Sequence, residues 1–271
     1  MSNVSSLGLS AANNEFTKDV YQHLAANTPH NAIISPCGLH MVLGLTSYGA
    51  AGSTADAMMK GLRIKHSETL LKDYKDIIEQ LSKSPELKMA NTIYFAQDVQ
   101  LNPIYQSQAV EYFNSELSKT DFTKPETAAK EMNKWVSNHT NGKIKRLVQS
   151  ESITRDTKLV LINAIHFKGK WSTPFRTKCT KDGPFYRDEI NSVQVPMMHT
   201  TCKFFIYQET GDDGFKVLEL PYGTKKEERR FSMHVFLPNK RTGLAALEKK
   251  FFQTNESFAE KFGNIVKSTY S

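Results

Sequence analysis

The sequence predicts a mixed α+β fold in which helices come first and strands follow. Apolar residues recur at helical spacing through much of the first half, whereas short strand-like runs follow one another closely in the second half. The regular alternation of strand and helix that is typical of dinucleotide-binding folds is not seen. Hydrophobic residues make up 39% of the chain and charged residues 23%, which is ordinary globular usage and argues against collagen-like and disordered classes.

Composition also restricts the partners that the chain can have. Its net charge is +7, but basic pairs such as Lys225–Lys226 stand beside acidic pairs such as Glu227–Glu228, so no nucleic-acid partner is expected. No stretch approaches the roughly 20 consecutive apolar residues that span a bilayer, so we expect a soluble chain without a membrane partner. Three cysteines without C-x-x-C spacing predict neither a disulfide framework nor a zinc site.

The first predicted elements are two helices with a short strand between them. Helical spacing of apolar residues predicts an amphipathic helix up to about Ala26, and a short strand is predicted over Asn31–Ile34. Ser35 and Pro36 then open a second helix, because a serine oxygen can accept a free N–H and proline suits the first helical position. The body of this helix is apolar nearly all round, which predicts that it is buried.

Further elements follow from capping and periodicity. Ser53 and Asp56 have the spacing of a capping box and predict a third helix. Pro125 begins a helix with one apolar stripe, which Asn141–Gly142 ends. Closely spaced strands, expected to be antiparallel, are predicted over Val193–Met198, Lys203–Gln208, Lys216–Tyr222 and Phe231–Leu237.

The strand predicted over Thr157–Lys168 differs from the others. It is apolar in both alternating phases, which is typical of a strand covered on both faces. Asn163 and His166 interrupt the apolar run. We interpret both as hydrogen-bonded polar residues of the core, because neither has a catalytic partner at a suggestive spacing.

Motifs for catalysis are not found in the sequence. There is no G-x-S-x-G elbow for a nucleophilic serine, no Gly-rich phosphate-binding loop and no H-E-x-x-H zinc motif. The eight histidines show no metal-ligand pairing, and no carboxylate pair stands out for acid–base chemistry. We therefore expect a protein that is not an enzyme and that holds no cofactor or metal.

Longer stretches carry more information than these short motifs. Asn31-x-x-x-Ser35-Pro36, Asn133-x-Trp135-Val136 and the run from Thr157 to Phe175 occur in one order and spacing that resembles the serpins, the serine protease inhibitor family. The similarity covers about residues 14–250 and looks insect- or arthropod-like. The positions that carry the family motif are Ser35, Pro36, Asn163, Trp171, Pro174, Phe175, Pro196 and Met197.

The resemblance implies a fold and an activity. The fold would be three β-sheets surrounded by helices, with an exposed reactive loop near the C-terminus. In the family, a serine or cysteine protease attacks this loop, which then inserts as a new strand into the main sheet and traps the protease. The resemblance implies an extracellular location. Residues 1–8 lack a signal-peptide pattern, so a cytoplasmic location stays open.

The sequence departs from the family pattern in two places. Residues 251–271 contain no run like a serpin hinge or reactive loop, so we expect a C-terminally truncated chain with a serpin-like domain at 1–250 and a divergent tail at 251–271. The strand Thr157–Lys168 would then be a sheet edge that is prone to aggregation. Inhibition by this chain alone is accordingly not expected, and the alternative is a non-inhibitory or self-associating fragment completed by a partner strand.

The second departure is Gly38. The family usually carries a serine there, two residues after the proline, within a polar cluster beneath the main sheet, so opening of the sheet is expected to be altered.

The sequence also contains two kinds of candidate surface site. Lys60, Arg63 and Lys65 are candidates for contact with a polyanion, against the alternative of an ordinary helix surface. The sequence motifs for N-glycosylation begin at Asn3, Asn138 and Asn255.

Overall fold

A computed structural model describes residues 4–27, 31–223, 231–253 and 267–270. The chain forms two compact units, Met1–Lys168 and Gly169–Ser271, and each is described by itself. The predicted α+β class is confirmed, because helices dominate the first unit and strands the second. Among the described residues, no helix has both the length and the apolar character needed to cross a bilayer.

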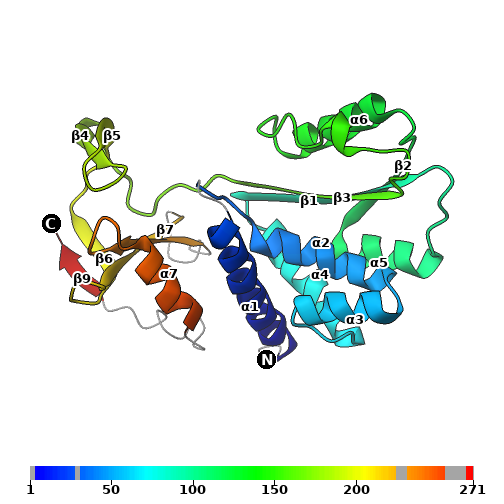
Figure 1. The fold of residues 1–271 in the computed structure, drawn as a ribbon, viewed down its shortest axis with the longest axis horizontal. Helices are drawn as coiled ribbons and strands as arrows, with labels where there is room; N and C mark the ends of the chain where they lie inside the picture. Colours follow the sequence, from blue (N-terminus) through cyan, green and yellow to red (C-terminus); the bar gives the residue numbers. More distant parts are fainter. Residues whose placement is uncertain (1–3, 28–30, 224–230, 254–266, 271) are drawn as a thin grey trace. The chain divides into compact units, whose positions relative to one another are not determined.

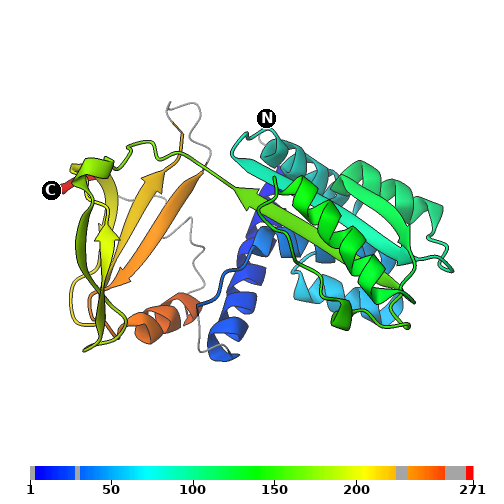
Figure 2. The ribbon, with the colours of Figure 1, turned by 90° about the horizontal axis from the view of Figure 1, so that it is seen from above.

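The first unit is a three-stranded sheet between two layers of helix (Figures 1 and 2). The strand order is β2-β1-β3, with β1 parallel to β2 and antiparallel to β3. Helix α6 covers one face, and α2, α4 and α5 lie on the other. The elements are α1 (Val4–Asn27), α2 (Pro36–Gly49), α3 (Gly52–Gly61), α4 (Glu68–Ser82), β1 (Leu87–Ala96), α5 (Pro103–Phe113), β2 (Ser115–Thr120), α6 (Pro125–His139), the short 3-10 helix η1 (Ser150–Ser152) and β3 (Leu159–Phe167).

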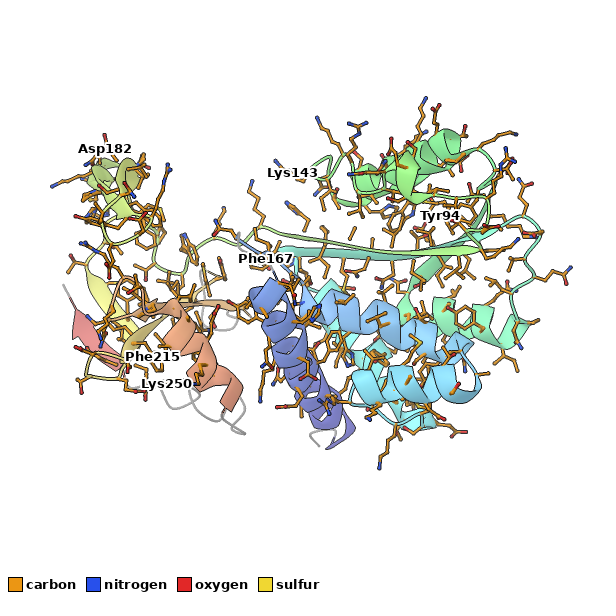
Figure 3. All side chains as sticks on the ribbon, in the orientation of Figure 1. Tyr94, Lys143, Phe167, Asp182, Phe215 and Lys250 are labelled. Carbon is orange, nitrogen blue, oxygen red and sulfur yellow. The ribbon has the colours of Figure 1, made fainter. Side chains whose placement is uncertain are left out.

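Two separate cores form on the two faces of this sheet because successive strand side chains point to opposite sides. Ile93 on β1 packs with the helices of the α2 face, whereas its neighbour Tyr94 packs beneath α6. Figure 3 labels Tyr94 in this second layer, between the strands and the helix. Met132 and Val136 of α6 are fully buried there, which confirms the apolar stripe predicted for the helix that begins at Pro125.

Three local predictions at helix starts and linkers need correction. The strand predicted over Asn31–Ile34 is wrong: these residues are irregular, no described strand pairs with them, and Ile33 is 99% exposed. Pro36 does begin α2, but the Ser35 side chain accepts no capping hydrogen bond from a described residue. The capping box at Ser53 is also wrong. The positive φ of Gly52 (56°) turns the chain one residue earlier, so Ser53 lies inside α3.

The second unit contains two further sheets, and the three predicted sheets are therefore present among the described residues. All its strand pairs are antiparallel, as predicted. A core of Phe215, Val217 and Leu247 lies between the larger sheet and α7. The elements are the 3-10 helix η2 (Thr177–Cys179), β4 (Lys181–Tyr186) with β5 (Ser192–Met197), and the sheet β8-β7-β6-β9, formed by β6 (Cys202–Gln208), β7 (Phe215–Pro221), β8 (Ser232–Pro238) and β9 (Lys267–Tyr270), with helix α7 (Leu244–Gln253).

Candidate strand-acceptor site

Strand β3 forms one edge of the sheet β2-β1-β3 in the described part of the chain. Its nine residues pair with β1 along one side only. In an antiparallel pair, every second residue of an edge strand directs its N–H and C=O groups away from its neighbour. β3 therefore presents a row of backbone donors and acceptors that a further strand can use.

The side chains of β3 are covered unequally on the two faces. Ile162 and Ala164 face α6 and are only 3% and 2% exposed. Leu161 and Ile165 belong to the other phase and are half-buried, and Phe167 at the end of the strand, labelled in Figure 3, is 36% exposed. The apolar side chains of β3 are thus left partly uncovered on the α2 face.

A polar pair lies at the centre of this half-covered face. Asn163 stands directly opposite Asn91 of β1, and its Nδ2 donates a hydrogen bond of 2.7 Å to Oδ1 of Asn91. Nδ2 of Asn91 in turn donates to the backbone carbonyl of Phe113 at 3.0 Å. The interpretation of Asn163 as a hydrogen-bonded core residue is confirmed. This chain of bonds ties β3 to β1 and β1 to the end of α5, and so fixes the register of the edge strand.

Gly38 makes room for the polar pair. A Cβ atom at Gly38 would lie 2.1 Å from Oδ1 of Asn163 and 2.7 Å from Cδ1 of Ile165. No side chain fits there unless Asn163 moves. The Asn163 amide occupies the space that a serine side chain at position 38 would fill. The first turn of α2 can therefore lie closer to β3 than it could with a serine there.

Cys37, the neighbour of Gly38, is an uncharged thiol in this setting. It packs against the apolar core of the α2 face, and burial raises the pKa of its thiol. The thiol form is therefore favoured over the thiolate, which is the nucleophile. The arrangement of Asn91, Asn163, Gly38 and Cys37 can position and pair backbone, but among the described residues it offers no nucleophile–base couple.

Comparison with known proteins identifies this architecture. The family model described as "Serpin (serine protease inhibitor)" matches residues 11–268. The chain belongs to the serpin family. Serpin-Z2A of Triticum aestivum is 33% identical over 231 residues, and neuroserpin of Gallus gallus is 33% identical over 265 residues. The solved structure titled "Cleaved Serpin 42Da" superposes with a TM-score of 0.88 at 30% identity and covers 97% of this chain and 70% of that chain.

These serpin relatives are longer than the chain. The aligned region is 83% of this chain but 57% of the wheat serpin, and 93% of this chain but 63% of the chicken neuroserpin. Similar serpins come from plants and from vertebrates. The expected insect or arthropod character is therefore not supported, and the resemblance is to serpins in general.

The serpin motif residues do not form one cluster. Ser35, Pro36 and Asn163 lie in the first unit, where Gly38 brings the start of α2 against Asn163. The remaining five belong to the second unit. Trp171 stacks on Tyr222 with ring centroids 4.4 Å apart, and Phe175 meets Trp171 edge-on at 6.3 Å. Pro174 and Pro196 are exposed, and Met197 is half-buried on β5.

The three proposed polyanion contacts are exposed, but one of them is paired. Arg63 has a positive φ of 57°, and its Nη2 lies 2.9 Å from Oδ2 of Asp19 on α1. Lys60 and Lys65 are exposed on either side of it. Because Asp19 offsets one of three cations, this surface attracts an anion less strongly than the sequence alone indicates.

Of the three glycosylation motifs, only the middle one can be placed. Asn138 is exposed in the last turn of α6. The Thr140 hydroxyl of the same motif is buried, and it donates to the carbonyl of Val136 at 2.8 Å. Asn3 and Asn255 lie outside the described residues.

Sequence reasoning missed the partner of Asn163 and the contact that Gly38 makes. Asn91 lies far from Asn163 in the sequence, and only the register of β1 with β3 shows that the two residues face each other. The same reasoning overlooked a buried histidine. His40 is 2% exposed, with Nε2 3.0 Å from the Leu62 carbonyl and Nδ1 3.2 Å from the Tyr74 hydroxyl. The sequence signal that could have revealed it is the position of this histidine within the otherwise apolar helix α2.

Proposed function

We propose that the chain is the strand-accepting part of a protease inhibitor, with the edge of β3 as the acceptor. The observation that carries this proposal is the edge strand β3, which is apolar on both faces. Among the described residues it pairs with β1 along one side and is unpaired along the other. Such an edge gains both hydrogen bonds and apolar contacts when another strand joins it.

In this mechanism the chemistry of bond cleavage belongs to the target protease. The protease nucleophile attacks a peptide bond of the reactive loop and forms an acyl-enzyme, which accounts for the lack of a catalytic motif in this sequence. The freed loop then adds to β3 as a new strand and carries the acylated protease with it. The role of the chain is to provide the acceptor backbone and to hold β3 in register through Asn163 and Asn91.

The proposal includes two finer points. The hinge and the reactive loop come from sequence outside these 271 residues, since no hinge-like run occurs within them. The partner is a serine or cysteine protease. Family membership favours an extracellular location, and the exposed Asn138 would then be available for glycosylation.

Two measurements test this function. The intact mass of the endogenous protein, with peptide sequencing beyond Lys250, should show a species heavier than 30.7 kDa that carries a hinge and a loop. That longer species, mixed with trypsin-like, chymotrypsin-like and papain-like proteases, should form a covalent complex that survives denaturing electrophoresis. A longer species that is only cleaved, with no stable complex from any of the three, would contradict inhibition.

A non-inhibitory function uses the same edge. The half-covered α2 face of β3 favours a fragment that accepts a strand from a partner or from a second copy. If the endogenous species ends at Ser271, this alternative becomes the better account. It predicts concentration-dependent oligomers in size-exclusion chromatography, and a monodisperse monomer with a sharp melting transition would contradict it.

A further inference from the structure

A groove runs along the side of α6, outside the strand-acceptor site. One wall is α6, and the other is the segment that returns along it towards η1. Asn133 on α6 joins the two walls through hydrogen bonds to the returning segment. Its Oδ1 accepts hydrogen bonds from the backbone N–H groups of Leu147 (2.7 Å) and Val148 (2.9 Å), and its Nδ2 donates to the Val148 carbonyl at 2.7 Å. Three bonds to one side chain make this a preformed groove, with a volume of about 900 Å³.

Four cations line the groove. Lys130 and Lys134 lie on the helix, and Lys145 and Arg146 lie on the opposite wall. All four are exposed, and none has an ion-pair partner in the described part of the chain. Figure 3 shows nitrogen-tipped side chains projecting from α6 on the side away from the sheet.

Two other lysines of the same unit do have ion-pair partners. Lys124 lies 3.2 Å from Asp121, and Lys158 lies 2.7 Å from Asp98. The groove thus holds four cations that have no ion pair among the described residues. Unneutralised like charges held near one another repel, and a bound anion relieves that repulsion.

The charges are also separated along the groove. Its two carboxylates belong to Glu126, in the first turn of α6, and Glu151, in η1, which packs against α6. Lys145 and Arg146 instead precede the residues that Asn133 binds, nearer the other end of the helix. One end is therefore positive on both walls, and a chain-like anion can lie between them.

The remaining lining groups indicate the kind of anion. Lys130 and Lys134 are one helical turn apart, which separates them by about 6 Å along the axis and suits repeated charges on a linear polymer. Ser137, Asn138, Gln149 and Ser150 supply hydrogen-bonding side chains for hydroxyl groups. No aromatic ring lines the groove within the described residues, which disfavours the base stacking that single-stranded nucleic acids use.

We propose that this groove binds a linear sulfated polysaccharide. The site differs from the Lys60, Arg63 and Lys65 surface, where Asp19 already holds the arginine. It also gives Asn138 a second significance, because a glycan on this residue would occupy the groove. The proposal does not depend on protease inhibition or on the strand-acceptor site.

The test compares two triple variants that remove the same charge. Full-length chain made in bacteria, and therefore without a glycan on Asn138, is titrated with heparin at several salt concentrations. K134Q/K145Q/R146Q should weaken binding at least about tenfold and lower the salt dependence by about two counterions. K60Q/R63Q/K65Q should stay within about twofold of the unaltered chain.

Each other outcome overturns the proposal. Equal losses in the two variants would show that net charge alone attracts the polymer, and a loss only in K60Q/R63Q/K65Q would place the site at the other surface. Single-stranded DNA of matched length and charge that binds as tightly as heparin would overturn the ligand class. As a control for folding, the melting temperatures of the glutamine variants are compared with that of the unaltered chain, and equal values show that the variants are folded.

Discussion

The two faces of the sheet β2-β1-β3 hold the edge strand in different ways. On the α6 face, Ile162 and Ala164 are buried in a predominantly apolar layer. On the α2 face, β3 is half-buried and is fixed by one amide–amide bond beside Gly38. Burial therefore stabilises the attachment of β3 on one face, whereas a polar contact fixes its register on the other. The α2 face is therefore the side on which small changes should alter how β3 behaves.

The largest expected effect comes from removing matched side chains on opposite faces of the same strand. I162A should destabilise the protein by about 3 kcal/mol, because it opens a cavity in a sealed layer. I165A removes the same atoms from a half-buried position and should cost about 1 to 2 kcal/mol. Urea unfolding measures both free energies. Equal losses would show that the two faces hold β3 alike.

The next effect concerns the amide pair. N163L leaves Oδ1 of Asn91 without its donor and should cost about 1 to 2 kcal/mol, since a buried acceptor then lacks a partner. A double-mutant cycle of N91L and N163L should give a coupling energy of about 1 kcal/mol. Additive losses in the cycle would mean that the bond between Asn163 and Asn91 contributes nothing to stability.

Replacing Gly38 should disturb the same pair from the other side. G38S forces the Asn163 amide to move, and we expect a loss of about 1 kcal/mol even though serine is the better helix former. Gly61 of α3 is the matched control, because a Cβ there meets nothing within 4 Å. G61S should leave stability equal or raise it by about 0.5 kcal/mol. A stabilised G38S would contradict the close approach of α2 to β3.

The smallest effect is a pH dependence within the helical layer of the α2 face. Burial lowers the pKa of His40, which faces the Leu62 carbonyl, the Tyr74 hydroxyl and the Phe16 ring. The unfolded chain therefore takes up a proton first as the pH falls below about 6.5, so stability is full above that pH and is lost below it. Burial lowers the pKa of His66 as well, so this residue acts on stability in the same direction as His40. H40Q should reduce the slope of stability between pH 6.5 and 5, and an unchanged slope would show that His40 does not carry it.

Periodicity and capping predicted most of the elements, because apolar spacing along the chain reports which side of a helix or strand is buried. The helix that begins at Pro125 and the strand that contains Asn163 are clear cases. The capping box at Ser53 failed because a single positive φ at Gly52 starts the helix earlier. The strand at Asn31–Ile34 failed because a strand needs a neighbour, which local sequence does not report.

The candidate site was predictable only in part. The family motif pointed to Asn163, and the missing serine pointed to Gly38. The pairing of Asn163 with Asn91 depends on a register between residues 72 positions apart, which no local pattern contains. The α6 groove likewise depends on Asn133, which binds a segment 14 to 15 residues further along the chain.

We expect β3 to accept a strand at its free edge, and hydrogen exchange of its backbone amides can detect this. The chain is mixed with a peptide of serpin-hinge composition, rich in Glu, Gly, Thr and Ala. A second sample receives a version with proline at alternate positions, which cannot donate to a strand ladder. The first peptide should protect alternate amides between Leu159 and Phe167, and the proline version should not. Protection confined to other strands, equal protection by both peptides, or none in β3 would contradict it.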